Sequence, residues 1–236
     1  MSAGYGESDY KYFLYTCIIN AVVGGLLLLY GRGAENKMSR RDGYCVVTLS
    51  WVFFTFFGML PFYFSGSIDT ITNAFFETMS GFTTTGATIL DDIESLSHGM
   101  LFWRSLTQWI GGLGIVFFTI AILPIFTTGG VQLFSAESTG VTHDRTHPKI
   151  NVMAKWLWTI YLVLTVSETV LLMFGGMSLF DAICQSFATT ATGGYSTKQN
   201  SISYWNSPYI EYVVAIFMIV SSINFSLFLM CLKGKV

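Results

Sequence analysis

Residues 71–90 read ITNAFFETMSGFTTTGATIL, an apolar stretch that runs directly into a series of threonine, glycine and alanine residues. The apolar part, Ile71–Phe82, has about twelve residues, whereas a helix needs about 20 to cross a membrane. A helix of this length fits one that enters a bilayer part-way and turns back. The threonine and glycine residues would then lie at membrane depth, where non-helical backbone is tolerated only if it is shielded or lines a wet cavity.

A second stretch with the same order lies further along the chain. Leu179–Thr189 reads LFDAICQSFAT and runs into TATGGYST. The two stretches align on Gly86 and Gly193, at an offset of 107 residues. This alignment also matches Thr85 with Thr192. Because a long apolar segment precedes and follows each copy, the order of the elements predicts an internal repeat.

Five apolar stretches are long enough to cross a bilayer. They are Tyr10–Gly31, Tyr44–Phe64, Met100–Phe126, Trp156–Phe174 and Tyr209–Leu232. Helix is the structure expected for them, because isolated strands cannot satisfy their backbone in lipid. The composition agrees, since charged residues make up 11% of the 236 residues, against roughly 25% in soluble domains. We therefore predict an all-α polytopic membrane protein, with re-entrant half-helices followed by extended filter segments.

This order divides the chain into four predicted parts. They are an N-terminal transmembrane helix with its cytoplasmic loop (1–43), a first span–pore loop–span repeat (44–126), a cytoplasmic linker (127–155) and a second such repeat (156–236).

Lysine and arginine gather on one alternating side of these spans. The 32–43 loop, the 127–155 segment and the C-terminal tail hold nine of the 12 Lys and Arg residues, whereas segment 65–99 holds none. By the positive-inside rule, the N-terminus is predicted outside and the tail in the cytoplasm. The net charge of −2 predicts no general basic surface, so nucleic acid is not an expected partner.

The threonine–glycine segments have the chemistry expected of a cation filter. A dehydrated cation needs oxygens in place of water, and backbone carbonyls supply them when an extended chain turns them toward one axis. Such a chain needs residues that tolerate positive φ, which predicts that role for Gly86 and Gly193. The predicted filter residues are Thr84, Thr85, Gly86, Ala87, Ala191, Thr192, Gly193 and Gly194.

A surface loop after an interfacial helix explains either copy taken alone equally well. Two copies, each between two spans and on the same side, favour pore loops instead.

The sequence around these segments resembles a known family. FFETMSGFTTTGATIL at 75–90, followed by FWRSLTQWIGGLGIVFFTIAILP at 102–124, resembles the first pore repeat of the TrkH/KtrB potassium transporters. FDAICQSFATTATGGYST at 180–197 resembles the second, and the resemblance covers nearly the whole chain from about residue 10.

The resemblance implies the fold of the superfamily of K⁺ transporters, in which four M1–pore loop–M2 repeats surround one pore. It implies K⁺ as the transported ion, bound at the filter residues, with Glu77, Thr83 and Thr190 in support and no covalently bound cofactor. It also implies a homodimer in the bacterial inner membrane and a cytosolic nucleotide-binding regulatory subunit. Channel and symport mechanisms both stay open.

The sequence departs from the family in its number of repeats. It holds two, with one preceding helix, and two pore segments make half of a fourfold filter. Either the chain is a fragment or half-length chains associate, and a fragment is what we expect. The missing third and fourth repeats of the same protein would then complete the pore.

Two charged residues lie inside the predicted spans. Arg104, near the outer end of its span, is expected to pair with Asp91, Asp92 or Glu94, or to snorkel to the interface. Glu168 lies deeper, and an intramembrane acid is by default a functional candidate. We expect it to hydrogen-bond a neighbouring helix or the back of a pore loop.

Other functions have less support from the sequence. The motifs HExxH, GxSxG, GxGxxG and the P-loop are absent from it, so an enzyme is not expected. A non-conducting membrane scaffold subunit remains the main alternative to potassium transport, because half a pore cannot conduct by itself.

Overall fold

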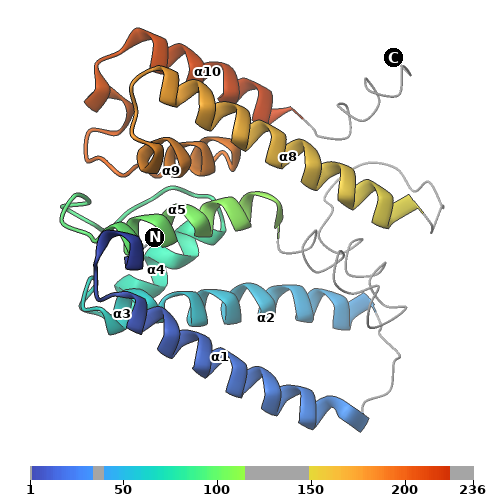
Figure 1. The fold of residues 1–236 in the computed structure, drawn as a ribbon. Helices are drawn as coiled ribbons and strands as arrows, with labels where there is room; N and C mark the ends of the chain where they lie inside the picture. The colour runs from blue at the N-terminus through green and yellow to red at the C-terminus, as the bar shows by residue number, and fades with distance from the viewer. Residues whose placement is uncertain (1, 34–39, 115–148, 224–236) are drawn as a thin grey trace.

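The computed structural model describes residues 2–33, 40–114 and 149–223, which fold into helices and connecting loops without any strand (Figure 1). The α-helices are α1 (Tyr10–Tyr30), α2 (Arg40–Gly58), α3 (Leu60–Phe64), α4 (Ile71–Phe82), α5 (His98–Gly112), α8 (Lys149–Phe174), α9 (Leu179–Thr190) and α10 (Pro208–Ser222). Short 3-10 turns lie at Ser2–Tyr5, Gly31–Gly33 and Ser201–Trp205.

The long predicted spans correspond to α1, α2 with α3, α5, α8 and α10. Within the described residues, Tyr10–Gly33 and Trp156–Phe174 are long and apolar enough to cross a membrane. Helix α8 begins earlier than predicted, at Lys149. The distal parts of the predicted third and fifth spans, from residues 115 and 224 onward, lie outside the described residues.

The predicted single span Tyr44–Phe64 is interrupted. Helix α2 ends at Gly58 and α3 begins at Leu60, because Pro61 has no N–H with which to continue the helical hydrogen bonds. The Gly58 carbonyl, at the end of α2, accepts a hydrogen bond from the indole Nε1 of Trp103 (2.9 Å). Gly58 also makes room for α4, since a Cβ there would meet the Phe82 ring at 2.7 Å.

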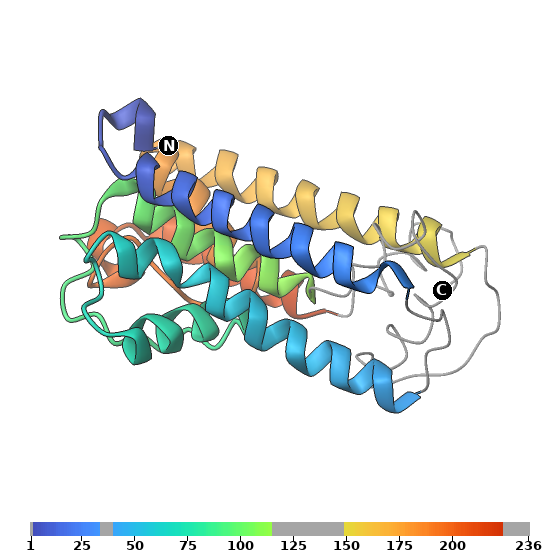
Figure 2. The ribbon, with the colours of Figure 1, turned by 90° about the horizontal axis from the view of Figure 1, so that it is seen from below.

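The two short helices match the predicted re-entrant ones. Helix α4 has the predicted bounds, and α9 is one residue longer than predicted. Each begins at a hydroxyl cap: Thr70 accepts from the Asn73 N–H, and Ser178 accepts from the Asp181 N–H. Both lie toward the end of the molecule that carries the N-terminus, where α9 runs beside only part of α8 (Figures 1 and 2).

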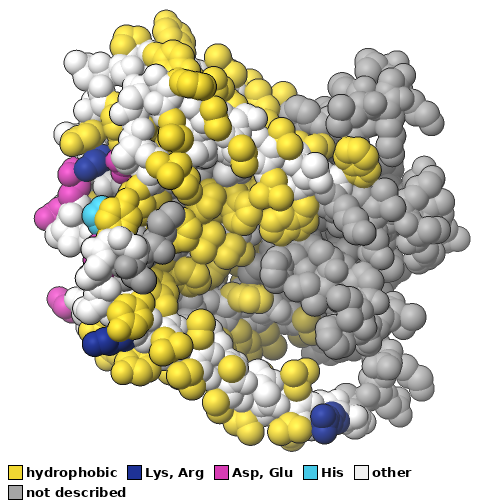
Figure 3. Space-filling view, in the orientation of Figure 1, with side chains coloured by type: hydrophobic (Ala, Val, Ile, Leu, Met, Phe, Trp, Pro, Cys, Tyr) yellow, Lys and Arg dark blue, Asp and Glu magenta, His cyan; other side chains and the backbone are white. Residues whose placement is uncertain are grey.

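Charged side chains gather at this same end, which we call the loop end and define by residues 65–70, 88–97 and 195–207. Figure 3 shows acidic side chains there, while apolar side chains cover the visible flanks of the helices. On α1, large apolar residues such as Leu14, Val22 and Leu26 are more than half exposed. This surface suits a lipid environment.

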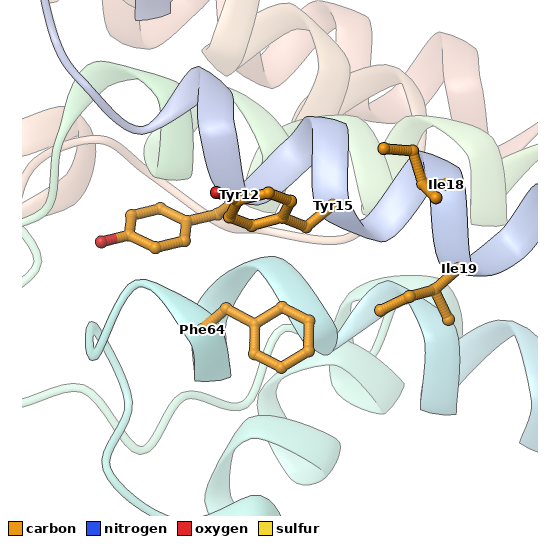
Figure 4. A pocket seen from close by; sticks show the side chains of 5 residues that line it. All are labelled: Tyr12, Tyr15, Ile18, Ile19 and Phe64. Atoms are coloured by element: carbon orange, nitrogen blue, oxygen red, sulfur yellow. The ribbon is translucent and has the colours of Figure 1, made fainter.

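An open apolar groove of about 500 Å³ lies between α1 and α3 (Figure 4). Its lining residues are Tyr12, Tyr15, Ile18, Ile19 and Phe64, none of which belongs to the threonine–glycine segments.

Helix α5 joins the first helical set, α2–α5, to the second, α8–α10. The hydroxyl of Tyr161 on α8 donates to the Trp109 carbonyl (2.9 Å), and the Trp109 ring stacks on Phe187 of α9. Close approach requires glycine here, because a Cβ on Gly112 would meet the Ala191 Cα at 2.7 Å. The threonine–glycine segments of both sets are thereby brought together.

Candidate functional site

Each half-helix ends in the same hydrogen-bonded turn. The second and third residues after the helix donate N–H groups to carbonyls of its last turn, which is a Schellman motif. The bonds are Thr84 to Gly81 (3.0 Å), Thr85 to Ser80 (2.9 Å), Thr192 to Thr189 (2.9 Å) and Gly193 to Ala188 (2.8 Å). Thr84 and Thr192 have φ values of 53° and 55°, although such positions usually hold glycine. A β-branched residue there stores strain of order 1–3 kcal/mol.

These turns place the two copies 108 residues apart, not 107 as the glycine alignment predicts. Gly86 (φ 75°) corresponds to Gly194 (φ 85°), which lies 108 residues further along the chain. Gly193 does not have positive φ. The predicted match of Gly86 with Gly193 is therefore wrong by one residue. The error comes from the two adjacent glycines of the second copy. Matching identical residues pairs Gly86 with Gly193, whereas counting from the end of each helix pairs Gly86 with Gly194.

The corrected register changes which residues are equivalent. Ala191 caps the C-terminus of α9 and does not lie in the extended part. Ala87 corresponds to Tyr195, and the Ala87 carbonyl accepts a hydrogen bond from the Ser80 hydroxyl (2.6 Å). We call Thr84–Gly86 the first filter segment and Thr192–Gly194 the second, after the filter role that the sequence predicts for them.

The two filter segments touch each other at glycine. A Cβ on Gly86 would overlap the carbonyl oxygen of Gly193. A Cβ on Gly193 would overlap the side-chain amide of Gln108. By contrast, the space beside Gly194 is open. Glycine is thus required at position 86 both because φ is positive and because a side chain would clash. At position 193 only the clash requires glycine, and at position 194 only the positive φ does.

A buried ion pair lies behind the filter segments. Arg104 Nε donates to Glu77 Oε1 at 2.7 Å, and both side chains are at most 2% exposed. Glu77 also accepts from the Thr88 hydroxyl (2.9 Å) and the Ile89 N–H (3.0 Å), just beyond the first segment. The guanidinium donates from Nη1 to the Ser196 carbonyl (3.0 Å), just beyond the second. One ion pair therefore connects the exits of both segments.

The predicted partners of Arg104 are wrong. Asp91 and Asp92 are exposed at the loop end, where Asp92 caps the N–H groups of Glu94 and Ser95. Glu94 instead pairs with Lys198 (3.3 Å). Arg104 does not snorkel either, because Glu77 lies one helix away and satisfies its charge inside the protein.

Nothing in the sequence predicts the role of Tyr195, which follows the glycine pair. Its ring is 2% exposed and lies 3.5 Å below the Arg104 guanidinium, a cation–π contact. Its hydroxyl donates to the Glu77 carbonyl (2.8 Å), so it links the second segment to α4. Chemistry offers one general expectation, which is that the hydroxyl of a buried tyrosine has a hydrogen-bond partner.

Hydrogen bonds also join the two sets at the loop end. The Ile93 N–H donates to Gln199 Oε1 (3.1 Å). Burial by itself would lower the pKa of Lys198, but the hydrogen bond and charge of Glu94 outweigh it and raise the pKa. The N-terminal residues add a cap, because Glu7 accepts from the N–H groups of His98 and Gly99 at the start of α5 (2.9 and 3.1 Å). Burial would raise the pKa of Glu7, but these bonds and the His98 ring lower it.

Glu168 lies on α8 and is fully buried. The hydroxyl of Thr190, the last residue of α9, donates to its Oε2 at 3.4 Å. Its Oε1 has no hydrogen-bond partner among the residues that the structure describes. Glu168 thus contacts the end of the helix that leads into the second filter segment.

We expect Glu168→Gln to preserve folding, because the amide oxygen can still accept from Thr190. Glu168→Leu should lower the thermal stability of the detergent-solubilised protein, since it leaves a buried hydroxyl unpaired at a cost of about 1–3 kcal/mol. Thr190→Val, which removes the other partner, should offset part of the Leu effect in the double variant. A Leu variant as stable as the parent would contradict this role.

Comparisons with known proteins show which family the chain belongs to. A family model for TrkH, described as a cation transport protein, matches residues 10–235. The chain belongs to the TrkH family. It is 43% identical over 233 residues to the Trk system potassium uptake protein TrkH of Escherichia coli K12, covering 98% of this chain and 48% of that protein. It is 38% identical over 225 residues to a TrkH of Halomonas elongata, covering 94% and 47%.

A solved TrkH structure confirms the predicted fold class. The crystal structure of the potassium transporter TrkH from Vibrio parahaemolyticus matches with a TM-score of 0.82 and 33% identity, over 99% of this chain and 47% of that one. The chain is therefore an all-α, polytopic membrane protein of the TrkH family, as the sequence predicts. It spans about half the length of the relatives it matches.

Proposed function

We propose that this chain contributes two filter segments to a potassium uptake pathway. The observation that carries the proposal is the pair of equivalent turns, in which φ is positive at Thr84 and Gly86 and again at Thr192 and Gly194. In an ordinary strand, successive residues alternate between two faces. A change in the sign of φ at every second residue allows successive carbonyls to turn to the same side, as a dehydrated cation requires.

The proposed coordinating groups are the backbone carbonyls of the two filter segments, Thr84–Gly86 and Thr192–Gly194. Thr83, Thr190 and Glu77 would support them from behind. Ala87 and Ala191, which the sequence places among the coordinating residues, are left out. The Ala87 carbonyl accepts a hydrogen bond from the Ser80 hydroxyl, and Ala191 belongs to the helix end.

The relatives support a proposal for the rest of the pathway. Their names state potassium uptake, and about half of their length lies beyond this match. We infer that third and fourth repeats complete the filter. We further propose that the complete protein forms a homodimer in the bacterial inner membrane with a cytosolic nucleotide-binding regulator.

Radioactive rubidium uptake by the complete protein in liposomes tests the function. We expect uptake that excess K⁺ suppresses and excess Na⁺ suppresses weakly, with empty liposomes as the control. A non-conducting scaffold would give no uptake above that control. The relatives are named as transport proteins, which also disfavours an enzyme.

The orientation can be tested separately. The basic residues of the 32–43 loop and the 127–155 segment predict a cytoplasmic location for both. With the native cysteines replaced by serine, single cysteines at Ser95 and Gly140 should react with an impermeant thiol reagent from opposite sides of the membrane. Labelling of both from the same side would contradict the predicted orientation.

A further inference from the structure

Gln108 lies on α5, is fully buried, and its side chain contacts the second filter segment. Its Oε1 accepts a hydrogen bond from the Tyr195 N–H at 3.0 Å, directly after Gly194. Its amide group also occupies the space that a Cβ on Gly193 would need. The side chain therefore fixes the second segment in two ways, by a hydrogen bond at its exit and by contact at its middle residue.

The side-chain nitrogen of Gln108, Nε2, faces the contact between the two segments. Nε2 has no hydrogen-bond partner among the residues that the structure describes, although a buried amide nitrogen normally has one. It lies 3.9 Å from the place where a Cβ on Gly86 would be, and Gly86 in turn contacts the Gly193 carbonyl. The amide nitrogen therefore lies next to the contact between Gly86 of the first segment and Gly193 of the second.

We propose that Gln108 is a positioning residue that sets the second filter segment against the first and thereby the preference of the pathway for K⁺ over Na⁺. The proposal rests on the proposed function. Discrimination between two ions of the same charge depends on the placement of the coordinating carbonyls. A side chain that holds both the Gly193 backbone and the Tyr195 N–H controls the placement of two successive peptide groups.

Gln185 provides a matched control. It is also a buried glutamine, at 6% exposure, and it lies on α9, the helix that leads into the second segment; its Nε2, however, donates to Thr189 within that helix. Its Oε1 has no partner among the described residues. Substitution of either glutamine by methionine keeps a similar volume, but only Gln108→Met leaves the Tyr195 N–H without its acceptor.

The test compares initial rubidium and sodium uptake by Gln108→Met and Gln185→Met in the complete protein, at equal protein amounts in liposomes. We expect Gln108→Met to lower the ratio of rubidium to sodium uptake about tenfold, the size expected for losing a hydrogen bond to a buried N–H. Gln185→Met should change the ratio less than about twofold. An unchanged ratio in Gln108→Met, with parental uptake intact, would overturn the proposal. Absence of uptake by the parent would instead refute the proposed function.

A double-mutant cycle with Gly193 separates positioning from general damage. If the Gln108 amide is what excludes a side chain at Gly193, then Gly193→Ala should reduce selectivity strongly in the parent but much less in the Gln108→Ala background. Melting temperatures in K⁺ and in Na⁺ give a second readout, because an ion bound only by the folded state raises the melting temperature. Additive effects of Gly193→Ala and Gln108→Ala on both readouts would overturn the proposal.

Discussion

Gly86→Ser is expected to lower the selectivity of the complete protein for K⁺ over Na⁺ by about tenfold or more. At φ 75° a side chain costs of order 1–3 kcal/mol, and the new Cβ would also overlap the Gly193 carbonyl oxygen. The chain can relieve both by turning carbonyls of the two segments away from their common side. The amount of protein in the membrane should change little, because the helices around the segments stay packed. Parallel K⁺ and Na⁺ uptake at matched protein amounts measures the effect.

Two other glycines make this experiment specific. Gly176 also has positive φ (94°) and open space beside it, but it lies in the loop after α8, outside the filter segments. Gly176→Ser should therefore carry the same kind of backbone strain and leave selectivity unchanged. Gly194→Ser should reduce selectivity less than Gly86→Ser, because only its φ of 85° opposes the side chain. Equal selectivity in the parent and in Gly86→Ser would contradict the filter assignment and show that these segments are ordinary loops.

The sequence predicts the half-helices well but misses the register of the segments that follow them. Length and hydroxyl caps define where α4 and α9 begin, because these are local properties of the chain. The one-residue error in register arises just after α9, where either of two adjacent glycines could match Gly86, which lies two residues after a threonine in the left-handed region. Few β-branched residues adopt positive φ, so no sequence pattern predicts that conformation for Thr84 and Thr192.

Tertiary contacts explain the other differences. The sequence places Arg104 among acids that are close along the chain, but the structure pairs it with Glu77 on the facing helix, 27 residues away. The same holds for Gln108 and Tyr195, whose hydrogen bond joins residues 87 positions apart. Such pairs depend on how α5 packs between the two helical sets, and a single sequence carries no information about that packing until the helices are placed.

Arg104→Met should prevent most of the protein from folding. Removing one partner of a buried ion pair costs about 3–5 kcal/mol, because the Glu77 carboxylate is left buried without its countercharge. The change also removes the hydrogen bond to the Ser196 carbonyl and the contact with the Tyr195 ring. Size-exclusion profiles of detergent extracts should show little monodisperse protein. Lys198→Met, which breaks the partly exposed pair with Glu94, should cost at most about 1 kcal/mol and serves as the control.

The double variant Glu77→Gln with Arg104→Met should recover much of the folded protein that Arg104→Met loses, because no buried charge is then left unpaired. Recovery of folding without recovery of ion selectivity would show that the pair also positions the filter exits. A double variant no better folded than Arg104→Met would contradict the charge argument and assign the cost to the lost contacts with Ser196 and Tyr195.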